Sequence, residues 1–184
     1  MKETLQELIS YLKNPVLEKD SNTENSYRVH KFLHLLSISI LTSFFLMPLF
    51  AIVEHLELID MEKHAMESML KDFSKPIIFL FVVVVAPLTE EFIFRGPLTL
   101  FKRKKVFKIA FYTFAILFGL IHITNYKITS NVLLLTPILI APQIILGSYL
   151  GFIRVRFGLA WSILLHACYN AFFMLITFAG DGML

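Results

Sequence analysis

The chain has 184 residues, of which 57% are hydrophobic and 17% are charged, and its formal net charge is +3. A soluble domain of this length is about half apolar and about a quarter charged, so the mean hydropathy of +0.70 favours one polytopic membrane domain. The small net charge carries no nucleic-acid signature, and the single Cys168 excludes an intrachain disulfide and a cysteine-based metal site.

The first 31 residues form a polar segment with no hydrophobic core of a cleavable signal peptide. Leu5, Leu8, Ile9 and Leu12 follow helical spacing, which predicts a short amphipathic helix that ends before Pro15. We expect this helix to lie on the membrane surface or on the protein.

Five apolar segments are near the length of about 20 residues that a membrane-spanning helix needs. They are Phe32–Val53, Ile77–Leu100, Phe107–Ile123, Val132–Phe152 and Leu159–Phe178. The sequence therefore predicts an all-α membrane protein, a bundle of about five transmembrane helices with amphipathic interfacial helices. One of these, in loop 54–75, has apolar residues at every fourth position from Met61 to Phe73. We divide the chain into the N-terminal segment 1–31, the first span with its loop helix 32–75, a core 76–178 and a tail 179–184.

Most lysines and arginines outside the spans lie in segments 1–31, 101–108 and 153–158, which five spans place on one side of the membrane. The positive-inside rule predicts a cytoplasmic N-terminus and a C-terminus outside.

Polar residues interrupt the second span. Glu90, Glu91 and Arg95 lie in it, although a charged side chain at bilayer depth costs about 2.5–3.5 kcal/mol even on insertion scales. Glu91 and Arg95 are four residues apart and can pair on one helical face, whereas Glu90 has no cation on its own helix. Pro87 frees a backbone carbonyl of the preceding turn, which is tolerated where backbone lines a cavity.

Other polar groups fall at similar depth in two further spans. His122 ends the third span, and His166 and Asn170 share a face of the fifth. Glu90 beside a histidine can activate water as a general base, and a histidine with an asparagine can donate hydrogen bonds to an oxyanion. A divalent metal, zinc, bound by Glu90, His122 and His166, is the alternative. Ser162 shares the face of His166 but has no evident partner.

Two further patterns concern packing. Gly147 and Gly151 have the small-xxx-small spacing of a helix-packing face, and Pro137 and Pro142 predict a kink in the fourth span.

The motifs Glu90-Glu91-FIF-Arg95, Phe118-GLI-His122 and His166-ACY-Asn170 occur in this order on three predicted spans. In them the chain resembles the CPBP family, also called the Abi family or type II CAAX prenyl proteases, which are intramembrane proteases. The resemblance covers about residues 76–173. It implies that Glu90 is the water-activating base with His122, that His166 and Asn170 form the oxyanion hole, and that Glu91 and Arg95 support the site.

The resemblance also implies the substrate and the location. The expected function is cleavage of a peptide bond in a membrane-associated peptide or protein by glutamate-activated water, in a bacterial plasma membrane. The expected partners are the lipid bilayer and that substrate, with no nucleic acid. The family's prenyl-protein processors have more spans than the five predicted here. The alternative is a non-catalytic membrane partner that resembles the family's bacteriocin self-immunity proteins.

Overall fold

The computed structural model describes residues 1–60 and 65–181, and within these ranges the chain is helical with no strand. The elements are α1 (Lys2–Lys13), α2 (Asn25–His55), α3 (Ala65–Asp72), α4 (Lys75–Phe79), the π-helix η2 (Leu80–Val85), α5 (Ala86–Phe94), the 3-10 turn η3 (Pro97–Leu100), α6 (Lys104–Ile121), the 3-10 turn η4 (His122–Asn125), α7 (Ser130–Leu139), α8 (Ala141–Phe157) and α9 (Leu159–Asp181).

Five helical segments of the described chain are long and apolar enough to cross a membrane. They are Asn25–His55, Lys75–Leu100, Lys104–Asn125, Ser130–Phe157 and Leu159–Gly180. Each contains or closely overlaps one predicted span, so the expected fold class and the five spans are confirmed. The first is longer than expected because its helix begins at Asn25, within the polar segment.

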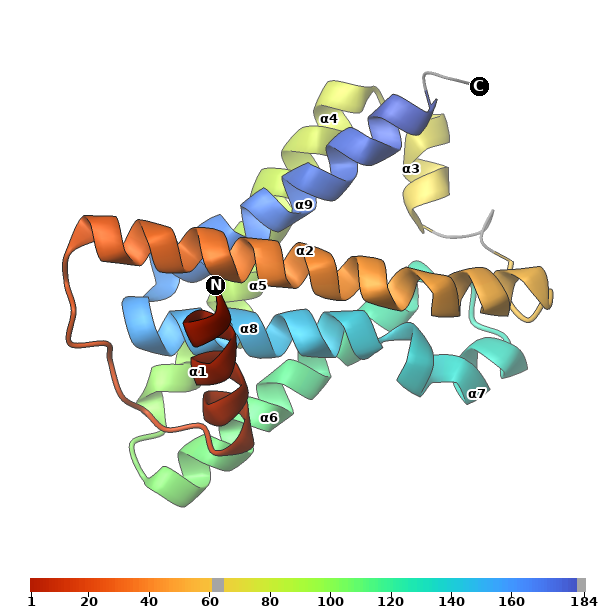
Figure 1. Cartoon of the computed structure of the whole chain (residues 1–184). Coiled ribbons are helices and arrows are strands. Elements are labelled where there is room, and N and C mark those ends of the chain that lie inside the picture. The colour runs from red at the N-terminus through yellow and green to blue at the C-terminus, as the bar shows by residue number, and fades with distance from the viewer. Residues whose placement is uncertain (61–64, 182–184) are drawn as a thin grey trace.

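The helices diverge into two arms. In Figure 1, α2 and α8 run side by side, while α9 leaves them together with α4 and α5 at a steep angle. The larger buried cluster lies where α1, α2, α6, α8 and the start of α9 meet, around Leu35, Phe111 and Leu150. A smaller cluster, around Ile78 and Met174, joins α4 to the far end of α9. The candidate functional site lies in the interior between the two arms.

The amphipathic helix α1 packs on the protein, one of the two expected locations. Leu8 is fully buried, and Tyr11 packs edge-on against Phe111 and Phe152, with ring centroids 5.6 and 5.0 Å apart. Leu5 and Ile9 remain exposed on the other face.

The fourth span is broken, as its prolines predict. α7 ends at Leu139 and α8 begins at Ala141, with Pro137 and Pro142 on either side of the break. Beyond it, Gly147 and Gly151 are buried, and a Cβ added at Gly151 would lie 2.8 Å from the Phe111 ring of α6. The small residues thus allow α8 to approach α6 closely, as the spacing indicates.

The predicted loop helix is present in part as α3. Its Met66, Met69 and Leu70 pack against the cluster of Ile78 and Met174, and the helix contacts α4. Met61, the first residue of the predicted pattern, lies outside the described residues.

Candidate active site

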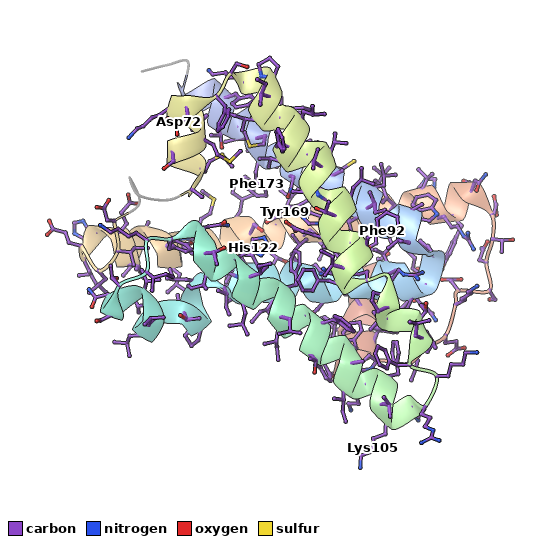
Figure 2. The ribbon with its side chains drawn as sticks, turned by 180° about the vertical axis from the view of Figure 1, so that it is seen from behind. Asp72, Phe92, Lys105, His122, Tyr169 and Phe173 are labelled. Atoms are coloured by element: carbon purple, nitrogen blue, oxygen red, sulfur yellow. The ribbon has the colours of Figure 1, made fainter. Side chains whose placement is uncertain are left out.

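A cavity of about 330 Å³ lies between the two arms of the fold. Glu90 of α5, His122 of η4, and His166 and Asn170 of α9 all line it. Figure 2 shows His122, Tyr169 and Phe173 together near the centre of the molecule, where α9 diverges from α6. Three different spans therefore bring the four polar residues to one interior space.

The π-helix explains how backbone comes to participate in this site. In η2 the Ala86 N–H donates to the Phe81 carbonyl five residues earlier. In the same register the next donor would be residue 87 and its acceptor Val82, but Pro87 has no N–H. The free Val82 carbonyl instead accepts a hydrogen bond of 2.8 Å from Asn170 Nδ2 of α9. The carbonyl that Pro87 is expected to free thus joins the second span to the fifth.

Glu91 is the fully buried carboxylate of the pair. Its Oε1 lies 3.4 Å from Arg95 Nη1, the same-face ion pair expected from the sequence, and 3.1 Å from His166 Nδ1. Ser162 Oγ donates to its Oε2 at 2.5 Å. The expectation that Ser162 has no partner is therefore wrong, because that partner comes from another helix.

Arg95 is held from three directions, and its side chain is only 1% exposed. Its Nη2 donates to the Gly147 carbonyl at 3.1 Å, and its guanidinium lies 4.1 Å from the centroid of the Phe118 ring. The Phe118 ring also packs against His122 and His166, at centroid distances of 4.8 and 5.6 Å. The apolar Phe118 ring therefore lies between the Glu91–Arg95 ion pair and His122.

Glu90 has a different environment. Its Oε2 atom is buried and has no hydrogen-bond partner among the described residues. His166 Nε2 lies 3.8 Å from this oxygen, too far for a direct hydrogen bond. A separation of this size is one that a single water molecule can bridge.

Both imidazole rings are oriented through Nδ1. His166 Nδ1 faces the Glu91 carboxylate, and His122 Nδ1 lies 2.7 Å from the Phe118 carbonyl. A carboxylate and a carbonyl only accept, so each Nδ1 carries a proton and donates it. The Nε2 atom of each ring is left for the cavity.

The three residues of the zinc alternative lie around one cavity. Across residues 1–60 and 65–181, no group of three or more His, Cys, Asp or Glu side chains could hold a metal ion. Glu90, His122 and His166 line one cavity without forming such a group.

Sequence reasoning missed Gln143 of α8, which lines the same cavity. Its Oε1 is buried with no hydrogen-bond partner in the described part of the chain. An amide in an otherwise apolar span is the signal that could have found it. It gives the cavity a further hydrogen-bond acceptor, from α8.

The sequence of this region is similar to a known protein family. A model described as Type II CAAX prenyl endopeptidase Rce1-like matches residues 72–172, which include all three motifs. No curated protein and no solved structure matches the chain significantly. The matched region contains α5, α6 and most of α9, the helices that carry the motif residues, and the chain belongs to the Rce1-like family of type II CAAX prenyl endopeptidases.

Proposed function

We propose that the protein is an intramembrane endopeptidase in which Glu90 activates water to hydrolyse a peptide bond of a membrane-associated peptide or protein. The observation that carries the proposal is the Glu90 Oε2 atom, which is buried in the cavity without a hydrogen-bond partner among the described residues. A buried carboxylate oxygen without a partner is costly, and a polar substrate or water in the cavity would supply one.

In the proposed reaction, Glu90 takes a proton from a water molecule while the water oxygen attacks the carbonyl carbon of the substrate. His122, with its Nδ1–H donated to Phe118, has an Nε2 lone pair with which it can help to hold that water. Collapse of the tetrahedral intermediate breaks the C–N bond, and Glu90 returns its proton to the leaving amine.

The oxyanion would be stabilised by His166 and Asn170. Glu91 accepts from His166 Nδ1, as an acid orients a histidine in other hydrolytic sites, which directs Nε2 to the cavity. In its imidazolium form the ring would donate the Nε2–H to the oxyanion. Asn170 uses one Nδ2 hydrogen on Val82 and has a second one to donate. Gln143 Oε1 is placed to accept a backbone N–H of the bound peptide.

The test is peptide cleavage by the purified protein in detergent, measured by mass spectrometry on prenylated and unprenylated membrane-anchored peptides. Glu90→Gln keeps the shape of the side chain and removes the base, so cleavage should fall about 10²–10⁴-fold. Glu57→Gln, the same change at an exposed residue near the end of α2, should leave the rate unaltered.

Cleavage by Glu90→Gln at the wild-type rate would rule out the proposed base. If the wild type binds a membrane partner without cutting it, and Glu90→Gln and His166→Ala bind it equally well, the non-catalytic alternative is correct.

A further inference from the structure

A second, strongly basic cavity lies at the end of the bundle away from α3. It has a volume of about 690 Å³ and lies between the α1–α2 linker, the start of α2, η3 and the end of α8. In Figure 1 these segments meet at the left, opposite the C-terminal end of α9. We call it the basic pocket, and its charged residues are Lys19, Asp20, Arg28, Arg154 and Arg156. None of the candidate active-site residues lines it.

The single carboxylate of the basic pocket is already engaged. Asp20 accepts hydrogen bonds from the Asn22 amide, the Tyr27 hydroxyl and Lys31 Nζ, at 2.9, 3.0 and 3.2 Å. Partial burial opposes the charged form, but these hydrogen bonds together hold the pKa of Asp20 below its usual value. Asp20 is therefore ionised at neutral pH, and it shares the cation Lys31 with Glu7.

The cations of the pocket are less well balanced. Arg156 pairs with Glu7 at 3.0 Å. Lys19, Arg28 and Arg154 have no carboxylate partner among the residues that the structure describes. Three positive charges without a salt bridge to a described residue, around one cavity, favour an anionic occupant.

The guanidinium groups are fixed in place and retain free donors. Arg154 Nε donates to the Arg95 carbonyl at 2.9 Å and Nη2 to Thr99 Oγ1 at 3.1 Å, which leaves Nη1 without a hydrogen bond to any described residue. Arg156 Nε is buried and also lacks a partner in the described chain. The Arg28 guanidinium lies 5.3 Å from the centroid of the Phe157 ring. A planar guanidinium with free N–H groups matches the geometry of a phosphate.

We propose that the basic pocket binds a phosphate group, carried by an anionic lipid headgroup or by a soluble phosphate compound. The pocket lies at the end of the helices that the positive-inside rule assigns to the cytoplasm, where anionic headgroups are concentrated. Arg154 connects it to the end of α5, since its guanidinium holds the Arg95 carbonyl there. A phosphate in the pocket would therefore stabilise the end of the helix that carries both glutamates.

The experiment has a lipid arm and a soluble arm. In the first, native mass spectrometry follows binding of phosphatidylglycerol, with zwitterionic phosphatidylcholine as the comparison, to the full chain in detergent. In the second, thermal unfolding is measured with inorganic phosphate against chloride at equal ionic strength. Lys19→Gln/Arg28→Gln should weaken binding about fivefold for each cation removed.

The matched control is Lys102→Gln/Lys105→Gln, which removes the same charge from the other basic loop at the same end of the bundle, outside the pocket. It should leave binding unchanged. Lys19→Gln alone, at a residue with no hydrogen bond in the described structure, should lower affinity about fivefold without disturbing the fold.

A response to phosphatidylglycerol alone assigns the site to lipid, and a response to inorganic phosphate assigns it to a soluble ligand. Either response supports phosphate binding in the basic pocket. The proposal is overturned if neither probe binds, or if the pocket variants and the control variants weaken binding equally.

Discussion

At the scale of single residues, the two adjacent glutamates differ in burial and in partners. Glu91 is fully buried and is held by Arg95, His166 and Ser162. Glu90 is 24% exposed, and its Oε2 has no hydrogen-bond partner among the described residues. The contacts of Glu91 suit it to orient neighbouring side chains. The unpaired buried oxygen of Glu90 suits it to proton transfer.

Substitution of Glu91 should therefore lower stability, whereas substitution of Glu90 should lower activity and leave stability nearly unchanged. Glu91→Gln leaves Arg95 buried without its carboxylate, and breaking such a pair costs about 3–5 kcal/mol in the free energy of unfolding. Glu90→Gln removes no hydrogen bond made by Oε2 to a described residue, so its free energy of unfolding should stay within about 0.5 kcal/mol of the wild type. Denaturation of both variants in one detergent, followed by circular dichroism, measures the difference.

Equal losses of stability in the two variants would contradict this division of roles. Arg95→Lys is a useful companion, because a lysine keeps the charge but cannot reach both Glu91 and the Gly147 carbonyl with a planar fork.

At the scale of elements, the π-helix before α5 is the unusual feature. π-helical turns are rare and are often found at functional sites. Here the register places the missing N–H of Pro87 opposite Val82, and Asn170 supplies the donor from α9. Asn170 thus both faces the cavity and fixes the distance between the two helices that carry Glu90 and His166.

A double-mutant cycle can test whether Asn170 replaces the N–H that Pro87 lacks as the donor to the Val82 carbonyl. Asn170→Ala leaves the Val82 carbonyl without its donor and should cost about 1–3 kcal/mol in the free energy of unfolding. In a Pro87→Ala background the restored N–H can satisfy that carbonyl, so the same Asn170→Ala change should cost less. The expected coupling is about 0.5–3 kcal/mol, read from unfolding of the four proteins. Purely additive effects would show that Pro87 and Asn170 do not serve the same carbonyl.

The close contact of α8 with α6 leads to another prediction. A Cβ at Gly151 would lie 2.8 Å from Phe111, which is buried in the core and cannot move away. Gly151→Ala should therefore lower the free energy of unfolding by about 1–3 kcal/mol. At Gly180 of α9 an added Cβ meets nothing within 4 Å, so Gly180→Ala should be neutral or slightly stabilising. Thermal unfolding compares the two variants. Equal changes in their stability would mean that packing of α8 against α6 does not require a glycine at position 151.

Sequence patterns predict the elements better than the contacts between them. Hydropathy finds all five spans, the spacing of Glu91 and Arg95 predicts their ion pair, and Pro142 predicts the break before α8. The pairing of Ser162 with Glu91 and the position of Gln143 in the cavity depend on how separate helices pack. Helical spacing relates residues within one helix only, so neither could be read from it.

At the scale of the whole molecule, charge and cavities are unevenly distributed along the bundle. The basic pocket lies at one end, together with the loop that precedes α6, and the acidic residues after α2 lie at the other. The cavity with Glu90 lies between these ends and is covered in part by Met66 and Met69 of α3.

The direction in which the bundle crosses the membrane is the prediction for the molecule as a whole. Lys105 and Asp72 are exposed and lie at opposite ends, as Figure 2 shows. In a Cys168→Ser background, Asp72→Cys in intact cells should react with a thiol reagent that does not cross membranes, and Lys105→Cys should react only after the cells are opened. This follows from the basic loops being retained in the cytoplasm. The reverse pattern would place the basic pocket outside and remove its access to the anionic inner leaflet, so this labelling also tests whether a cytoplasmic lipid can be its ligand.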